Sequence, residues 1–93
     1  MILSYRCKHT EALLASGVCH RDRRSFERIA RRKLLLIDSA RTLHDLKVPP
    51  GNHLEALKAD RIGQHSIRIN GQYRVCFVWR NGDAYQVEIV DYH

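Results

Sequence analysis

The chain ends on three side chains that can each give or take a proton. Asp91, Tyr92 and His93 supply a carboxylate, a phenol and an imidazole directly after an apolar, strand-like run. Chain ends usually fray, so a terminus is a poor place for costly polar groups that have no task. Histidine titrates near neutral pH and can serve as an acid or as a base. The ending therefore suggests acid–base chemistry.

Cations are expected close to this ending. Arg68 and Arg74 fall on one face of two neighbouring predicted strands, where like charges are unfavourable. The pair would become favourable with a phosphate between them, because arginine forks match phosphate geometry. RNA carries its own nucleophile, the 2′-hydroxyl, so its cleavage requires a base, an acid and cations rather than a metal. The candidates are Asp91, Tyr92 and His93 for proton transfer, and Lys58, Arg68 and Arg74 for charge.

The net charge is concentrated in one half of the sequence. The 93 residues include 16 Lys and Arg against 10 Asp and Glu, a net charge of +6. Residues 1–47 hold 11 basic and 5 acidic groups, whereas residues 48–93 hold 5 of each. A solvated surface and a surface that faces RNA, DNA or an acidic protein segment both remain open.

Composition limits the class of protein. No apolar run reaches the roughly 20 residues that a membrane-spanning helix needs. The apolar and charged fractions are those of a folded chain, and we expect one domain over residues 1–93. Three cysteines are an odd number without a disulfide-scaffold spacing, which favours the cytoplasm. Cys7, His9, Cys19 and His20 do not have the usual zinc spacing, so neither a metal nor another cofactor is expected.

The N-terminal half predicts one short strand and two helices. Residues 1–7 are β-type, and residues 9–17 read as a short helix with Thr10 as its N-cap. Apolar residues at helical spacing predict a long second helix over residues 25–46, which the following prolines end.

The C-terminal half predicts a sheet. Residues 65–69, 73–79 and 84–92 are β-rich runs, separated by Asn-Gly pairs at 70–71 and 81–82. Asn-Gly between such runs is a strong hairpin signal.

The loop lengths decide which residues are buried. A two-residue first turn would place Ile67 on the face of Arg74, whereas a three-residue turn aligns Ile67 with Val75. Because burial specifies register, we expect three-residue loops at both turns. At the second turn this choice adds Tyr85 and Val87 to the apolar face.

Two segments resemble a known family. The stretch LEALKADRIGQHSIRINGQYRVCFVW (residues 54–79) and the ending VEIVDYH (residues 87–93) are similar to the HigB branch of the RelE/ParE-type toxins of bacterial toxin–antitoxin pairs. The resemblance extends over essentially the whole chain. It implies an α+β, RelE-like fold, in which N-terminal helices pack on one face of a mainly antiparallel twisted sheet. It also implies a ribosome-dependent endoribonuclease that cuts mRNA, blocks translation and is neutralised by a small helix-turn-helix antitoxin of the HigA type.

The same resemblance assigns site residues. Functional positions of the family fall on Lys58, Arg74 and the ending 91–93. Other members carry a histidine where this chain has Glu55, and His53 lies two positions upstream. Glu55 as the base, His53 reaching in from the side, and loss of this role all remain open. The candidate RNA contacts are Arg61, Arg68, His53 and His65.

Two other functions remain as alternatives. ParE-like relatives share the fold and inhibit DNA gyrase without catalysis, and a third possibility is an RNA-binding module without activity. A blocking protein does not need protonatable groups beside paired arginines. The ending therefore favours the nuclease.

Overall fold

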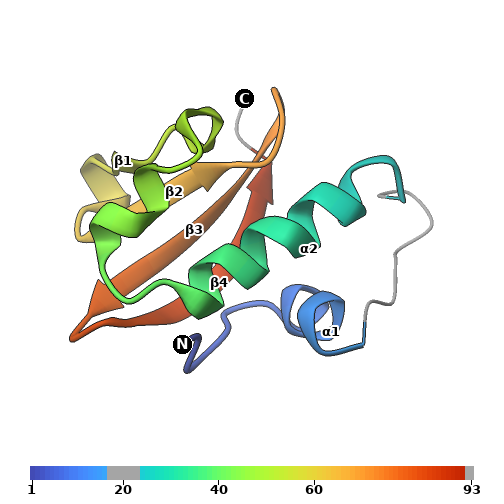
Figure 1. Cartoon of the computed structure of the whole chain (residues 1–93), viewed down its shortest axis with the longest axis horizontal. Coiled ribbons are helices and arrows are strands. Elements are labelled where there is room, and N and C mark those ends of the chain that lie inside the picture. The colour runs from blue at the N-terminus through green and yellow to red at the C-terminus, as the bar shows by residue number, and fades with distance from the viewer. Residues whose placement is uncertain (17–23, 92–93) are drawn as a thin grey trace.

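The computed structural model describes residues 1–16 and 24–91, and it confirms the expected α+β class (Figure 1). In this part of the chain the helices are α1 (Lys8–Ser16) and α2 (Arg24–Ser39). The 3-10 helices η2 (Leu43–Lys47) and η3 (Pro50–Asn52) lead from α2 to the sheet, and η4 (Ala59–Arg61) connects its first two strands. The strands are β1 (Glu55–Ala56), β2 (Gln64–Arg68), β3 (Tyr73–Arg80) and β4 (Asp83–Asp91). They form one antiparallel sheet in chain order. None of the described helices is long and apolar enough to cross a membrane.

Both helices pack on the same face of the sheet, as expected. Helix α2 lies along β3 and β4, and α1 lies beside α2 against β4 (Figure 1). Leu34 and Ile37 of α2 are fully buried together with Val75 and Phe77 of β3. This apolar layer holds the sheet rigidly enough to position side chains on its opposite face.

Helix α2 is shorter than the sequence pattern predicts. It ends at Ser39 rather than at residue 46, because a new turn begins at Thr42. The Asp45 carboxylate accepts hydrogen bonds from the N–H groups of Arg41 and Thr42, both at 3.0 Å, and the Thr42 hydroxyl accepts one from Asp45 N–H. This capping box takes the donors that a continuing helix would have used.

Thr10 has a different role from the predicted N-cap. Helix α1 begins at Lys8, so Thr10 lies inside it and is buried. Its Oγ1 accepts a hydrogen bond from Ile89 N–H at 3.2 Å. The hydroxyl therefore ties α1 to β4 near the end of that strand.

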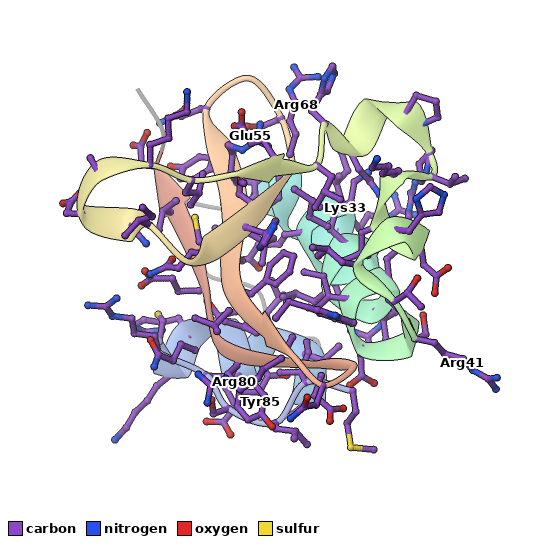
Figure 2. The ribbon with its side chains drawn as sticks, turned by 90° about the vertical axis from the view of Figure 1, so that its left-hand side faces the viewer. Lys33, Arg41, Glu55, Arg68, Arg80 and Tyr85 are labelled. Carbon is purple, nitrogen blue, oxygen red and sulfur yellow. The ribbon has the colours of Figure 1, made fainter. Side chains whose placement is uncertain are left out.

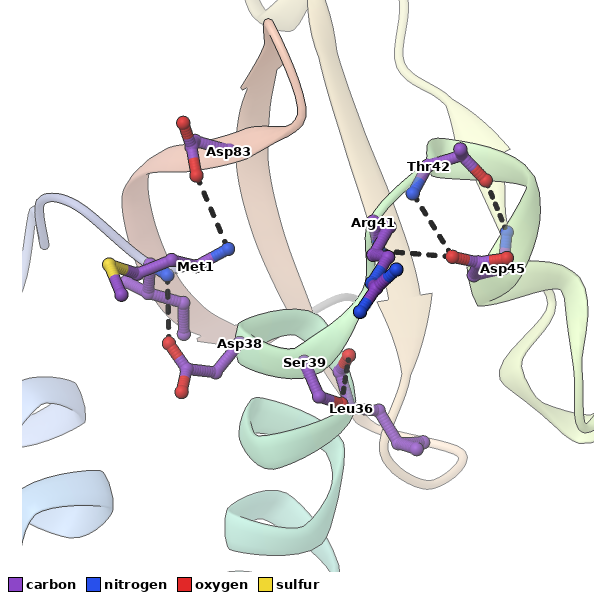
Figure 3. A network of polar contacts seen from close by, with 9 residues as sticks. Met1, Leu36, Asp38, Ser39, Arg41, Thr42, Asp45 and Asp83 are labelled. Carbon is purple, nitrogen blue, oxygen red and sulfur yellow. Dashed lines mark hydrogen bonds and ion pairs between the residues drawn. The ribbon is translucent and has the colours of Figure 1, made fainter.

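The predicted first strand is replaced by two isolated bridges. Ile2 pairs with Ala84 and Tyr5 with Val87, both in parallel orientation. The N-terminus is fixed by polar contacts as well, since the Met1 ammonium lies 3.3 Å from Asp83 Oδ1 and the Ile2 N–H donates to Asp38 Oδ1 at 2.9 Å (Figure 3).

The first hairpin has the predicted register. Ile67 lies opposite Val75, which leaves residues 70–72 as a three-residue loop. The Asn70 side-chain oxygen accepts a hydrogen bond from the N–H of Tyr73 at 2.8 Å and closes the loop.

The prediction for the second hairpin was wrong. Arg80 pairs with Asp83, so the turn has two residues, and Asn81 and Gly82 both have positive φ angles of 53° and 82°. Such two-residue turns match the twist of the strands. Tyr85 is consequently opposite Val78, away from the apolar face. A bulge at Gln86, whose φ is 54°, then returns the following residues to the expected face.

Candidate active site

The sheet face opposite the helices carries a carboxylate–guanidinium pair. Glu55 lies on the two-residue edge strand β1, opposite Ser66 of β2. Arg74 comes from β3, and its side chain crosses β2 to reach Glu55. Its Nε donates to Ser66 Oγ at 2.8 Å, and its Nη2 lies 3.3 Å from Glu55 Oε1. Three strands thus contribute to one polar cluster.

The two members of this pair differ in exposure. The Arg74 side chain is 12% exposed, whereas that of Glu55 is 52% exposed. Arg74 Nη2 also donates to the His53 carbonyl at 2.6 Å, and His53 presents this oxygen from a left-handed backbone conformation with φ 45°. The Arg74 guanidinium is therefore fixed by hydrogen bonds on its buried side, whereas the Glu55 carboxylate faces solvent. His53 contributes its carbonyl to the cluster, and its residue is otherwise exposed.

A second ion pair lies on the same face. Arg61 Nη1 donates to Glu88 Oε1 at 2.9 Å and to Gln64 Oε1 at 3.1 Å. The charge of Arg61, a predicted RNA contact, is therefore compensated within the fold. Cys76 lies between the two pairs and is fully buried, and this burial raises the pKa of its thiol. A thiol held in its protonated form is a poor nucleophile.

Two hollows border the edge strand. One, of about 360 Å³, is lined by Glu55, Ala56, Leu57 and Lys58. The other, of about 370 Å³, lies on the side of η2, and its lining includes Glu55, Ala56 and His65. Glu55 borders both, and Lys58, exposed at the start of η4, borders the first. The residues around Glu55 thus leave room for a ligand beside the carboxylate.

His65 is less available than the sequence suggests. Its ring packs 6.4 Å from that of Phe77, measured between centroids, and the residue is half-buried. Within the described part of the chain its Nδ1 is buried without a hydrogen-bond partner. The imidazole forms part of a hollow's wall rather than projecting from the surface.

The predicted arginine neighbours are indeed adjacent. Arg68 lies directly opposite Arg74 in the β2–β3 ladder. Arg68 is exposed, and its Nε donates to the Asn70 carbonyl at 3.2 Å. The two guanidinium groups do not face each other, because the Arg74 side chain turns toward Glu55. Glu55 and Arg68 are labelled in Figure 2.

The proton-transfer candidates at the C-terminus are only partly described. Asp91 lies opposite Tyr73, the residue before Arg74 in β3. Its Oδ2 accepts a hydrogen bond from Gln72 Nε2 at 3.0 Å. The structure therefore joins Asp91 to the 70–72 loop. Tyr92 and His93 lie outside the described residues.

Sequence reasoning missed two parts of this site. Ser66, the group that orients Arg74, was not among the predicted site residues; a hydroxyl opposite the residue two positions after an arginine on the neighbouring strand is the signal that could have suggested it. The His53 carbonyl carried no sequence signal, because its role depends on a backbone conformation. No group of three or more potential metal ligands occurs among residues 1–16 and 24–91.

Comparison with known proteins gives consistent matches. A protein-family model described as the RelE-like toxin of type II toxin–antitoxin system HigB matches residues 4–93. The Toxin HigB-1 of Vibrio cholerae is 39% identical over 85 residues, which cover 90% of each chain. The Endoribonuclease HigB of Proteus vulgaris is 35% identical over 94 residues, which cover 100% of each chain. An uncharacterized protein of Haemophilus influenzae is 38% identical over 57 residues, covering 61% of this chain and 56% of that relative.

Proposed function

This chain belongs to the HigB-like family of RelE-like toxins of type II toxin–antitoxin systems, and we propose that it acts as an endoribonuclease on mRNA, using the 2′-hydroxyl of the RNA as nucleophile. Membership of the family gives it an antitoxin partner. One observation carries the mechanism: a half-exposed carboxylate, Glu55, contacts a nearly buried guanidinium, Arg74, at 3.3 Å.

Glu55 is the proposed general base. Its carboxylate borders two hollows that could receive a nucleotide, whereas His53 meets the cluster through its carbonyl. The 2′-oxygen bonds to phosphorus while its proton passes to Glu55, and the bond from phosphorus to the 5′-oxygen breaks. The leaving oxygen takes a proton from an acid. The products are a 2′,3′-cyclic phosphate and a 5′-hydroxyl.

Arg74 and Lys58 are the proposed stabilisers of the charge that develops on phosphate. Arg74 is already oriented by Ser66 and by the His53 carbonyl, so it need not reorganise during the reaction. Preorganised donors of this kind contribute a large part of enzymatic rate enhancement. Lys58 lies on the same chain segment as Glu55 and lines one of the hollows beside it.

The proposed acid comes from the chain's ending. His93 is the first candidate because imidazole titrates near neutrality, with Tyr92 beside it. The bond from Ile89 N–H to Thr10 supports this assignment, since it fixes β4 two residues before Asp91. Asp91, held by Gln72, would position the ending rather than move a proton.

The finer partners are also part of the proposal. The substrate we favour is mRNA bound to the ribosome, where the protein would also contact ribosomal RNA. This substrate would place the protein in the cytoplasm. A HigA-like helix-turn-helix antitoxin would cover part of the basic N-terminal half. Arg28, Arg31 and Arg32 of α2 are exposed and would face it.

Mapping of RNA 5′ ends in bacterial cells after brief induction tests this function. Codon-phased new 5′ ends in mRNA, absent on induction of the Glu55→Gln variant, are expected. Intact mRNA together with DNA damage would refute the proposal and indicate a gyrase inhibitor.

A further inference from the structure

An apolar hollow of about 370 Å³ lies where the 3-10 helix η2 meets the edge of the sheet. Its lining includes Leu43, Leu54, Ala56 and His65, and the exposed Lys47 borders it as well. Its volume falls within the range of about 300–1,000 Å³ that is typical of sites for small ligands. The apolar hollow is therefore large enough for one flat ring system, such as a nucleobase.

The fold leaves the walls of the apolar hollow incompletely covered. Leu43 and Leu54 pack against the hydrophobic core, but each is only half-buried. The imidazole of His65 has its Nδ1 buried without a hydrogen-bond partner among residues 1–16 and 24–91, so it offers the surface of its ring rather than a hydrogen bond from Nδ1. Nucleobases stack on rings of this kind and bury apolar surface as they do so. These walls suit a base better than a charged group.

Glu55 joins the apolar hollow to the proposed active site. It lines this hollow and also the second hollow, the one that Lys58 borders. Its carboxylate contacts Arg74 at 3.3 Å. A ligand in the apolar hollow would consequently lie next to the residue that we propose as the general base.

The covalent structure of RNA matches this arrangement. In ribose, C2′ carries the attacking hydroxyl and is bonded to C1′, which carries the base, and to C3′, whose oxygen carries the scissile phosphate. A 2′-hydroxyl at Glu55 therefore has a base on one side and a phosphate on the other. The hollow that Lys58 borders suits the phosphate, because an ammonium compensates its charge. The apolar hollow suits the base.

We propose that the apolar hollow binds the base of the nucleotide on the 5′ side of the cleaved bond, the nucleotide whose own 2′-hydroxyl attacks. This inference rests on the proposed function. The base is held by stacking on His65 and by apolar contact with Leu43 and Leu54. Its binding fixes the ribose so that the 2′-hydroxyl lies at Glu55. Leu43, Leu54 and His65 are thus substrate-binding residues that take no part in proton transfer.

Removal of this one base is the most direct test. The substrate is an mRNA on programmed ribosomes with an abasic ribonucleotide, which keeps its 2′-hydroxyl, on the 5′ side of the mapped cleavage position. Single-turnover cleavage is measured at protein concentrations below saturation and compared with cleavage of the unmodified mRNA. Loss of one stacked base typically lowers affinity by about 5–150-fold. We expect a decrease of this size in the cleavage rate of the wild-type protein.

A variant assigns this loss to the hollow, because the ribosome can hold the same base. Leu43→Phe narrows the hollow, so cleavage of the unmodified mRNA should slow, and removal of the base should then cost far less than in wild type. Leu36→Phe is the matched control, because Leu36 is also a half-buried leucine against the core but lines neither hollow. It should show the full wild-type loss. Thermal melting verifies that both variants fold.

A pair of substitutions at His65 gives a second, independent test. His65→Ala removes the stacking surface and should reduce the effect of the missing base. His65→Phe keeps an aromatic ring and should retain the effect. This pair decides the question if Leu43→Phe does not fold.

Several results would overturn the inference. One is an equal loss from the missing base in wild type, Leu43→Phe and His65→Ala, and another is wild-type cleavage that does not depend on this base. Weakened antitoxin binding by Leu43→Phe, with an unchanged effect of the missing base, would instead assign the hollow to a side chain of the antitoxin. Failure of the proposed function is seen separately, because the wild-type protein would then leave the unmodified mRNA intact.

Discussion

The two carboxylate–guanidinium pairs on the open face make a matched test of the base assignment. Glu55 pairs with Arg74 at 3.3 Å and Glu88 pairs with Arg61 at 2.9 Å, but the Glu55 side chain is 52% exposed and that of Glu88 only 16%. Each glutamate is changed to glutamine, which keeps the shape and removes the charge. We predict opposite effects of the two substitutions on cleavage rate and on stability.

Glu55→Gln should affect the rate far more than stability. An exposed ion pair contributes about 0–1 kcal/mol to the free energy of unfolding. For a domain of this size, 1 kcal/mol changes Tm by roughly 4–8 °C, so Tm should fall by less than that. Loss of a general base, on the other hand, typically lowers the rate by about 10²–10⁴-fold.

Glu88→Gln should do the reverse. Removing one partner of a largely buried charged hydrogen bond costs about 1–3 kcal/mol, so its Tm should fall by more than that of Glu55→Gln. Its cleavage rate per folded molecule should stay within a few-fold of wild type. Single-turnover cleavage of mRNA on programmed ribosomes, with melting followed by circular dichroism, measures both quantities. A Glu55→Gln variant that cuts at the wild-type rate, or equal rate losses in both variants, would refute the assignment.

Three further predictions concern other parts of the chain. Neutralising Arg28, Arg31 and Arg32 together should weaken antitoxin binding and make the remaining affinity less sensitive to salt; unchanged affinity in a titration would contradict the proposed antitoxin surface. Deleting His93 should lower the cleavage rate by about 10²–10⁴-fold while antitoxin binding persists, and full toxicity at matched expression would exclude it as the acid. Burial raises the pKa of Cys76 above its ordinary 9.0, so the stability it contributes is complete below pH 9 and is lost as pH rises through the folded pKa. Urea unfolding at pH 7 and pH 10 should therefore show a smaller alkaline loss for Cys76→Ala than for wild type, and equal losses would contradict this linkage.

The sheet was largely predictable because its signals are local. The alternation of apolar residues and the Asn-Gly pairs predicted the three long strands. The need to bury Ile67 predicted the three-residue first loop. The prediction for the second loop failed because a bulge at Gln86 restores the register after a two-residue turn. A bulge inserts one residue without a composition signal, so alternation alone cannot distinguish it from a longer loop.

The site was predicted by residue type more than by geometry. Glu55, Arg68 and Arg74 were candidates, and the structure brings them to adjacent strands. The direction of the Arg74 side chain was not predictable, because it depends on Ser66 and on a carbonyl from a loop distant in sequence. Likewise, the sequence pattern of α2 does not indicate the contact of Lys33 with Asn52, which arises from tertiary packing.

The chemistry of the cut ends tests the central claim most directly. The substrate is an mRNA with a single 2′-deoxy nucleotide on the 5′ side of the mapped cleavage position, compared with the unmodified mRNA under otherwise identical conditions. We predict that the unmodified strand yields a 2′,3′-cyclic phosphate and a 5′-hydroxyl, and that the single deoxy substitution abolishes the cut at this position. Cleavage of the deoxy strand at a comparable rate, or a 5′-phosphate on the product of the unmodified strand, would contradict attack by the 2′-hydroxyl.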